Sequence, residues 1–312
     1  MEARLQIFSG NSNAGLSAEI VECLGVPLGR STVDTYQDGE TRIRLEENVR
    51  GSDVFIVQSL CNPVNHHIME MLLMVDAVRR SSASRVTAVI PYMGYAKQEK
   101  KTQSREPISA KLLANIITQA GADRVLAVDL HSAAIEGFFD IPVDHLRGAA
   151  ILASYFQKVY IPGAVVVSPD TGGVARANEF RERLGASLAI IYRQQQDSSS
   201  EGELEMVGDV EGKPAIIVDD MISTGSTLLS AAEALLERGA SEVYACATHG
   251  VFVNQALDTI EKSPIKSVVV TNTVPHRRED IPEKVKVLSV GSLIAESILR
   301  IHKDISMSSL FI

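Results

Sequence analysis

An internal repeat constrains the fold of this chain more than any other feature of its sequence. Residues 49–59, with the sequence VRGSDVFIVQS, align with residues 210–220, with the sequence VEGKPAIIVDD. After the helical stretch that follows each copy, residues 83–86 (ASRV) align with residues 240–243 (ASEV). Similarity repeated at such a distance is typical of a duplicated structural unit, so we expect two domains of similar fold.

Short apolar runs rich in β-branched residues alternate with amphipathic stretches along most of the chain. The runs have the length of buried strands, and the stretches have the spacing of helices with one apolar face. The expected strand cores are 54–57, 86–90, 125–128, 165–167, 216–218, 243–247 and 268–270. Regular alternation predicts an α/β fold with mostly parallel sheets. We place the domains at 1–147 and 148–289, with a C-terminal tail, 290–312, that packs on the first domain.

The composition is that of an ordinary globular protein, and it excludes several classes of function. Hydrophobic residues make up 45% and charged residues 22% of the 312 residues, and no apolar run is long enough to cross a bilayer. The formal net charge is −9, which argues against a nucleic-acid partner. Three cysteines without metal-ligand spacing, and no signal-peptide pattern, predict a protein of the reducing cytoplasm.

Residues 215–227, with the sequence AIIVDDMISTGST, combine a buried strand with a loop suited to anions. The loop, 223–227, precedes an expected helix, whose unpaired backbone N–H groups favour a phosphate, and its hydroxyl groups add donors. Asp219 and Asp220 would repel that phosphate. They suit instead the hydroxyl groups of a sugar, or a metal reached through water. A strand end followed by a Ser/Thr-capped turn is the simpler interpretation of the same motif.

Polar residues also follow two other expected strands. Asp129 and His131 follow one, and Asp170 precedes the paired glycines Gly172 and Gly173 after another. In open parallel sheets, ligands bind beyond the carboxyl ends of the strands. Asp170 is therefore a candidate ligand for Mg²⁺, although a plain strand-to-helix turn explains the glycines equally well. A lone histidine at a strand end is more often structural, which is the alternative for His131.

The loop at 215–227 resembles the phosphoribosyl-pyrophosphate-binding loop of the phosphoribosyltransferase-type fold, and the whole chain resembles the ribose-phosphate pyrophosphokinases. The matching segments are 38–40, 47–51, 69–80, 88–92, 128–131, 137–139, 168–170, 172–173, 215–227 and 308–311. The resemblance implies two phosphoribosyltransferase-type, Rossmann-like domains. It also implies transfer of the diphosphoryl group of ATP to the anomeric hydroxyl of ribose 5-phosphate, with Mg²⁺, giving phosphoribosyl pyrophosphate and AMP for nucleotide biosynthesis.

The resemblance implies an ATP site made of two groups of residues. Asp38, Gly39 and Glu40 are expected to meet the adenine end of ATP, and in the family they typically reach across from a neighbouring subunit. Lys97 and Gln98 take the positions of an Arg-Gln pair that contacts ATP. Members of the family usually form rings of dimers, commonly hexamers, so we expect a homo-oligomer.

The remaining site residues follow from the same resemblance. His131 and Asp170 match magnesium-linked positions. The two aspartates that hold the ribose hydroxyl groups and the residues that bind the 5-phosphate are Asp219, Asp220, Ser223, Thr224, Gly225, Ser226 and Thr227.

One segment departs from the family pattern. After residues 188–191 the family has a mobile loop that opens with a lysine and has an arginine two positions later, and both clamp the transferred diphosphate. Here Arg193 stands in place of the lysine and Gln195 in place of the arginine. Loss of a cation that stabilises the transition state lowers the rate by orders of magnitude. We expect Arg193 to be the catalytic cation.

Two other hypotheses remain. The altered loop favours a catalytically weak or silent subunit that regulates an active paralogue. A phosphoribosyltransferase that uses the same loop is the third hypothesis, and the duplicated domain with its ATP-side motifs opposes it.

Overall fold

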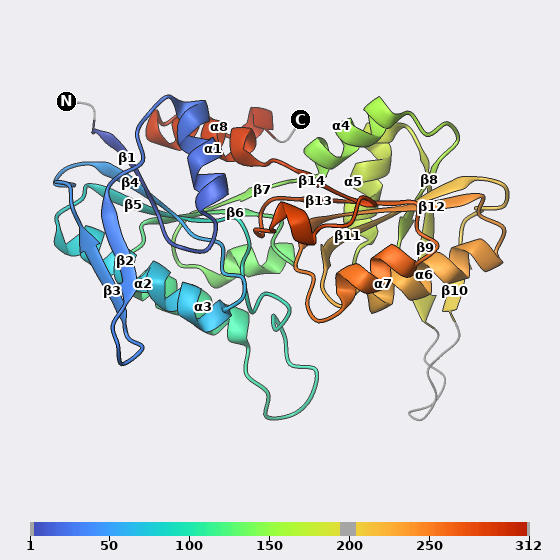
Figure 1. The fold of residues 1–312 in the computed structure, drawn as a ribbon, viewed down its shortest axis with the longest axis horizontal. Helices are drawn as coiled ribbons and strands as arrows, with labels where there is room; N and C mark the ends of the chain where they lie inside the picture. Colours follow the sequence, from blue (N-terminus) through green and yellow to red (C-terminus); the bar gives the residue numbers. More distant parts are fainter. Residues whose placement is uncertain (1–2, 194–203, 311–312) are drawn as a thin grey trace. The chain divides into compact units, whose positions relative to one another are not determined.

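The alternating sequence pattern folds into two α/β units in this computed structural model, which describes residues 3–193 and 204–310 (Figure 1). The first unit consists of Met1–Arg147, Thr273–Pro275 and Ser289–Ile312, and the second of Gly148–Asn272 and His276–Leu288. Both main sheets are mostly parallel, so the predicted α/β fold class is confirmed. Within the residues described, no helix is both long enough and apolar enough to span a membrane.

The first unit is built on a parallel sheet of five strands in its described part, in the order β1-β4-β5-β6-β7. These strands are β1 (Leu5–Ser9), β4 (Asp53–Val57), β5 (Arg85–Ile90), β6 (Arg124–Val128) and β7 (Val143–Leu146). Buried β-branched and other apolar residues form most of β4, β5 and β6, as is usual for the central strands of a parallel sheet covered on both faces.

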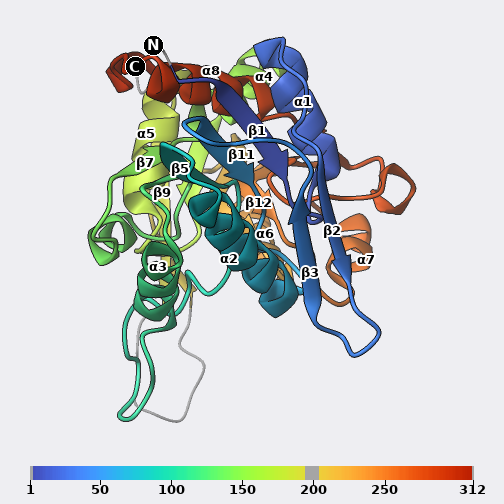
Figure 2. The ribbon, with the colours of Figure 1, turned by 90° about the vertical axis from the view of Figure 1, so that its left-hand side faces the viewer.

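Helices cover both faces of this sheet (Figures 1 and 2). They are α1 (Ala14–Leu24) and α8 (Gly291–His302) on one face, and α2 (Val64–Arg80) and α3 (Ser109–Ala120) on the other. An antiparallel hairpin, β2 (Ser31–Thr35) and β3 (Thr41–Leu45), forms a separate small sheet whose strand β3 packs against α2.

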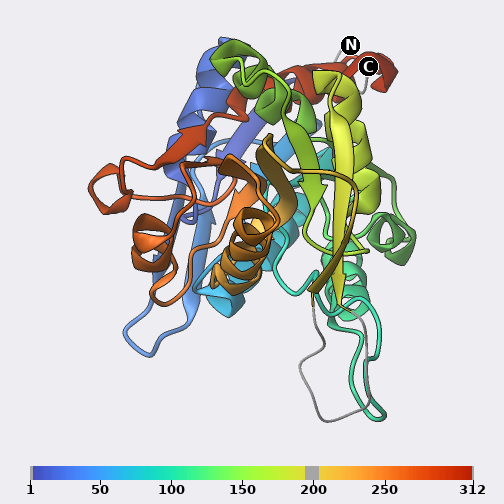
Figure 3. The same ribbon diagram turned by 90° about the vertical axis from the view of Figure 1, so that its right-hand side faces the viewer.

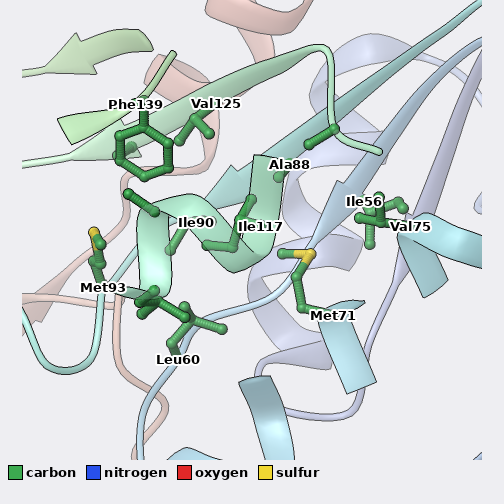
Figure 4. Packing of buried hydrophobic residues seen from close by; sticks show 14 of the residues in the cluster. Ile56, Leu60, Met71, Val75, Ala88, Ile90, Met93, Ile117, Val125 and Phe139 are labelled. Carbon is green, nitrogen blue, oxygen red and sulfur yellow. The ribbon is translucent and has the colours of Figure 1, made fainter. Parts of the chain in front are cut away.

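The core of the first unit lies between the sheet and the pair α2 and α3 (Figure 4). Ile56 and Ile90 from the strands meet Met71 of α2 and Ile117 of α3, and all four side chains are buried. Burial of a large apolar side chain contributes about 1.5–3 kcal/mol, so this layer holds the strand ends in place for the site residues that follow them.

A single buried carboxylate fastens the end of α8 to the sheet. Asp53, at the start of β4, is 2% exposed and accepts hydrogen bonds from Arg85 Nε (2.9 Å) and Nη2 (2.6 Å). His302 Nδ1 lies 2.9 Å from Asp53 Oδ2, and Arg85 Nη2 donates to the carbonyl oxygen of Ile301 at 2.7 Å. The C-terminal helix therefore belongs to the first unit through charged groups as well as through its packing against α1.

The second unit is built on a sheet of seven strands in its described part, in the order β10-β9-β8-β11-β12-β13-β14. They are β8 (Val165–Ser168), β9 (Ser187–Arg193), β10 (Leu204–Val207), β11 (Pro214–Ile222), β12 (Glu242–Gly250), β13 (Ser267–Thr271) and β14 (Val285–Leu288). All neighbouring pairs in this sheet are parallel except β9 and β10.

Two hydrophobic layers sandwich this second sheet (Figures 1 and 3). The helices are α4 (Ala149–Val159) and α5 (Val174–Leu184) on one face, and α6 (Ser226–Glu237) and α7 (Ala256–Lys262) on the other. Successive residues of a strand face opposite sides, and β11 shows it clearly. Ile217 belongs to the core under α6, and its neighbours Ile216 and Val218 belong to the core under α4 and α5.

The two units repeat one order of elements. In each, the first strand is followed by a helix, an antiparallel hairpin and a second strand, namely β1-α1-β2-β3-β4 and β8-α5-β9-β10-β11. Five strands then have the same neighbours, β1-β4-β5-β6-β7 in one sheet and β8-β11-β12-β13-β14 in the other. β4 and β11 are the strands that residues 49–59 and 210–220 predicted to correspond, so the topology agrees with an internal duplication.

We predict that Asp53→Ala lowers the free energy of unfolding by about 3 kcal/mol, because it leaves Arg85 and His302 without their shared partner in a mostly buried place. Asp34→Ala is the matched control, since it removes a carboxylate from the exposed pair with Arg42, and pairs of that kind contribute about 0–1 kcal/mol. Urea denaturation measures both. Equal effects of the two substitutions would contradict the anchoring role of Asp53.

Candidate active site

The loop between β11 and α6 has the geometry of an anion site. β11 ends at Ile222 and α6 begins at Ser226. Between them Gly225 has φ +82°, in the left-handed region that favours glycine. Thr224 Oγ1 lies 3.0 Å from Ser226 Oγ, and both side chains are exposed. The hydroxyl groups lie beside the backbone N–H groups and the positive end of the dipole of α6. All of these favour an anion, so the loop is suited to a phosphate.

The five residues predicted for the phosphate lie in this loop and at the start of α6. Ser223 is half-buried, Gly225 is buried, and Thr224, Ser226 and Thr227 are exposed.

The two aspartates at the end of β11 share one cation. Arg176, in the first turn of α5, places Nη1 3.2 Å from Asp219 Oδ1 and 3.6 Å from Asp220 Oδ1. Asp220 is only 3% exposed, and Asp219 is half-buried. Two neighbouring carboxylates repel each other, and their ionised forms also lose hydration on burial, so a single guanidinium compensates only part of the cost.

Asp219 changes charge near neutral pH. Its pKa is raised to about 7, first by burial and then by the charge and hydrogen bonding of Asp220, while the Arg176 guanidinium acts in the opposite direction. An ionised Asp219 accepts hydrogen bonds, whereas a protonated one must donate one. The site therefore accepts the hydroxyl groups of a ligand most readily above neutral pH.

The turn between β8 and α5 is held by its own polar groups. Gly173 N donates to Asp170 Oδ1 at 2.8 Å, and Ser168 Oγ donates to the carbonyl oxygen of Asp170 at 2.7 Å. A Cβ atom on Gly173 would lie 2.9 Å from Ser168 Oγ, which explains the glycine. β8 pairs directly with β11, so this turn follows a strand that neighbours the one containing the aspartate pair. Asp170 is exposed and has the character of a metal ligand.

The predicted adenine-binding residues lie at the tip of the β2–β3 hairpin. Gly39 has φ +94°, and its N–H donates to the carbonyl oxygen of Tyr36 at 3.0 Å, which closes a tight turn. Asp38 Oδ1 accepts from Glu40 N at 3.2 Å. The Arg42 guanidinium lies 5.5 Å from the centre of the Tyr36 ring, which is 50% exposed. The tip is thus an ordered, exposed group of carboxylates and one aromatic ring.

Lys97 and Gln98 lie elsewhere in the same unit, between β5 and α3. Both are exposed. The side-chain oxygen of Gln98 accepts a hydrogen bond from Ser109 Oγ, and its backbone carbonyl oxygen accepts one from Ala110 N at 3.2 Å. Gln98 is therefore bonded to the start of α3. The segment joining β5 to α3 and the hairpin tip lie on opposite sides of α2 (Figure 2), so this unit does not gather the two groups of predicted ATP residues.

The candidate metal residues belong to different units. His131 follows β6 in the first unit and is half-buried, while Asp170 follows β8 in the second. Among the residues that the structure describes, no group of three or more His, Cys, Asp and Glu side chains is arranged to hold a metal ion. Mg²⁺ does not require one, because it usually binds through one or two carboxylates together with waters and substrate phosphates.

The predicted catalytic cation lies at the limit of the described chain. Arg193 is the last residue of β9, where its backbone pairs with Leu204 of β10. Its side chain and Gln195 lie outside the described residues. Tyr192, the residue before Arg193, donates a hydrogen bond from its hydroxyl group to the carboxylate of Glu205 on β10. That pair links β9 to β10 next to Arg193.

Arg176 was not among the residues predicted from the sequence. Its only sequence signal is a basic residue three positions after the paired glycines, in the first turn of an expected helix. Its function depends on β11, a strand more than forty residues later, so spacing within its own segment does not reveal it.

Comparison with known proteins identifies the family. Residues 5–121 match the N-terminal domain of ribose phosphate pyrophosphokinase, and residues 200–312 match the phosphoribosyl synthetase-associated domain. The chain is 53% identical to a ribose-phosphate pyrophosphokinase of Caldanaerobacter subterraneus subsp. tengcongensis, over 98% of each chain. It is 50% identical to that of Bacillus subtilis, over 99% of this chain and 98% of the relative.

A solved structure agrees with these relatives. Phosphoribosylpyrophosphate synthetase from Mycobacterium smegmatis superposes with a TM-score of 0.92 and 40% identity, covering 96% of this chain and 99% of the other. Relatives of such identity over nearly the whole chain confirm the predicted resemblance, and the protein is an enzyme of the transferase class. The chain belongs to the ribose-phosphate pyrophosphokinase family.

Proposed function

We propose that this enzyme transfers the diphosphoryl group of ATP to the anomeric hydroxyl of ribose 5-phosphate, giving phosphoribosyl pyrophosphate and AMP for nucleotide biosynthesis. The observation that carries the proposal is the arrangement at the end of β11. A carboxylate pair held by Arg176 lies near the end of β11, shortly before a hydroxyl-rich loop at the N-terminus of α6. Full-length relatives named as ribose-phosphate pyrophosphokinases support the same reaction.

The two parts of this loop suit the two ends of the sugar phosphate. The first turn of α6 and the hydroxyl groups of residues 223–227 bind the 5-phosphate, because they offer donors and a positive dipole. Asp219 and Asp220 accept hydrogen bonds from the ribose hydroxyl groups. Binding at both ends fixes the anomeric hydroxyl, and such positioning is the main contribution that a protein makes to phosphoryl-type transfer.

Mg²⁺ fits the second unit through Asp170, whose exposed carboxylate uses one oxygen to accept the hydrogen bond from Gly173 N. When bound together with the phosphates of ATP, Mg²⁺ neutralises their charge. His131 is the weaker candidate for a direct ligand, since Mg²⁺ prefers oxygen atoms.

The ATP-side residues support an oligomer. Within one chain, the hairpin tip with Asp38, Gly39 and Glu40 lies across α2 from the segment with Lys97 and Gln98 (Figure 2). One ATP molecule that meets both groups therefore takes them from two subunits, and we propose a homo-oligomer, a hexamer by family resemblance. The free state of Cys23, Cys61 and Cys246 in the structure suits the cytoplasm, where we place the enzyme.

A second candidate function is a catalytically weak or silent subunit that regulates an active paralogue. The sequence of the segment after β9 favours it, because Gln195 stands where the family has a diphosphate-clamping arginine. The ordered aspartate pair and phosphate loop oppose it, because a purely regulatory chain has no need of a complete sugar-phosphate site.

We predict that the purified protein forms AMP and phosphoribosyl pyrophosphate from ATP, ribose 5-phosphate and Mg²⁺, detected by ³¹P NMR. Asp219→Asn is expected to raise KM for ribose 5-phosphate about 10- to 100-fold, because it weakens charge-assisted hydrogen bonds to the sugar. Asp209→Asn is the control, since Asp209 pairs with Lys213 on the surface of the same unit. Folded wild-type protein that binds ribose 5-phosphate without forming AMP would contradict the proposed reaction, and co-purification with an active paralogue would then favour the regulatory function.

We predict that Arg193→Lys combined with Gln195→Arg raises kcat, because it restores both family cations beside the transferred diphosphate. Steady-state kinetics at saturating ATP and ribose 5-phosphate measure the change, with each single substitution as a control. An unchanged or lower kcat would mean that this enzyme neutralises the diphosphate with other residues.

We predict that the affinity for ribose 5-phosphate rises about tenfold between about pH 6 and pH 8, because Asp219 loses its proton with a pKa of about 7. Isothermal titration calorimetry measures this affinity. Asp219→Asn isolates the contribution of the substrate's own phosphate, which also ionises near this range. Arg176→Gln is expected to move the midpoint to higher pH, because it removes the cation that lowers the pKa of Asp219. Identical pH profiles for wild type and Asp219→Asn would refute the assignment.

A further inference from the structure

The segment that contains Asp129, Leu130 and His131 leaves β6 in an unusual conformation. Asp129 N still donates to the carbonyl oxygen of Leu146 on β7, at 3.0 Å, which is the last backbone bond between these strands. Asp129 then has φ +37°, a left-handed conformation that residues with a side chain rarely adopt. Such a conformation persists only when the surrounding structure holds it.

His145 of β7 holds this segment at both ends. Its imidazole is 3% exposed, and its Nε2 accepts a hydrogen bond from Leu130 N at 2.8 Å. Its Nδ1 lies 2.5 Å from Glu136 Oε1, on the short helix η1 (Ala133–Phe138) that follows His131. Because Nε2 accepts, the ring proton is on Nδ1, which donates to Glu136. One ring therefore connects the start of the segment to its end.

Arg147, the residue that follows β7, strengthens this arrangement. Its Nη1 lies 3.2 Å from His145 Nε2 and 3.9 Å from Asp129 Oδ1. The lone pair of Nε2 thus faces two donors, the Leu130 N–H and the Arg147 guanidinium, and both disfavour a proton at that atom. Burial and the nearby Arg147 charge also lower the pKa of His145.

We propose that His145 is a positioning residue for the reaction, which fixes the backbone of residues 129–131 and thereby the place of the His131 side chain. The proposal rests on the proposed function, in which His131 occupies a magnesium-linked position. His145 acts through the Leu130 N–H and Glu136 and needs no contact with substrate. A shift of about 1 Å in a catalytic group is enough to lower the rate about 100-fold, so the loss of this hydrogen bond has a measurable effect.

Two substitutions separate positioning from packing. His145→Phe keeps a planar ring and loses both hydrogen bonds, whereas His145→Gln keeps an acceptor oxygen within reach of the Leu130 N–H. We expect His145→Phe to lower kcat at least about 10-fold, with KM for ribose 5-phosphate nearly unchanged because the sugar-phosphate loop belongs to the other unit. His145→Gln is expected to recover most of kcat.

His67→Phe is the matched control. His67 is also a buried histidine of the first unit, but its Nδ1 is bonded to the carbonyl oxygen of Cys61, and it is not part of the 129–136 segment. We expect it to change thermal stability without the selective loss of kcat. Wild-type kcat in His145→Phe, or equal losses of kcat in the Phe and Gln variants, would overturn the proposal.

The tautomer of His145 can be measured without metal or substrate. This measurement therefore tests the role of His145 independently of the proposed enzymatic reaction. In the full-length, metal-free protein, ¹H–¹⁵N correlation spectra of the imidazoles are expected to show His145 as the neutral Nδ1–H tautomer, and Glu136→Ala is expected to shift its Nδ1 signal. An Nε2–H tautomer would overturn the proposal even if the enzyme is active. The expected tautomer in a protein that never forms AMP would refute the proposed function and leave the geometry of His145 established.

Discussion

Two neighbouring carboxylates near the end of a mostly buried strand need a nearby cation, and this need constrains the arrangement of the second unit around them. Asp219 and Asp220 lie beside each other with Arg176 as their shared cation. Burial of like charges is unfavourable unless other groups compensate for it, and here α5 has to begin where Arg176 reaches β11. Gly173, the residue before α5, has little room for a side chain, since a Cβ atom there would lie 2.9 Å from Ser168 Oγ.

The first unit has the same fold, but the repeat places no carboxylate pair at the corresponding positions. Where the second unit has Asp219 and Asp220, the repeat places Gln58 and Ser59. Gln58 is fully buried and donates from Nε2 to Glu70 at 2.6 Å, and Asn11 donates to the same carboxylate from its backbone N (3.2 Å) and Nδ2 (2.7 Å). The carboxylate of Glu70 therefore accepts the hydrogen bonds that Asn11, after β1, and Gln58, after β4, donate. The two units thus share one scaffold, and in the first unit these polar side chains are bonded to one another.

The sequence was sufficient for those features that depend on neighbours along the chain. Strand cores such as 54–57 and 216–218 follow from apolar runs, and the anion loop follows from a strand, hydroxyl groups and a helix start in direct succession. Arg176 and His145 could not be assigned in this way, because their partners are on other elements. Thr273–Pro275 likewise joins the first unit through a distant contact, in which Ser59 Oγ donates to the carbonyl oxygen of Thr273.

The two units carry different residues at the ends of corresponding hairpins. β2–β3 and β9–β10 are inserted at the same point of the repeated order, after the first strand and its helix. The strands of an antiparallel hairpin pair with each other, so such an insertion can extend from a domain without leaving unpaired backbone groups. β2–β3 does this as a separate small sheet with its carboxylates at the tip, while β9 remains paired with β8 and ends at Arg193. The position of the insertion is a property of the fold, whereas the charges at its end are free to vary. The pairing of β9 with β8 runs from Ser187 to Ile190, so a change at Arg193 lies beyond that pairing.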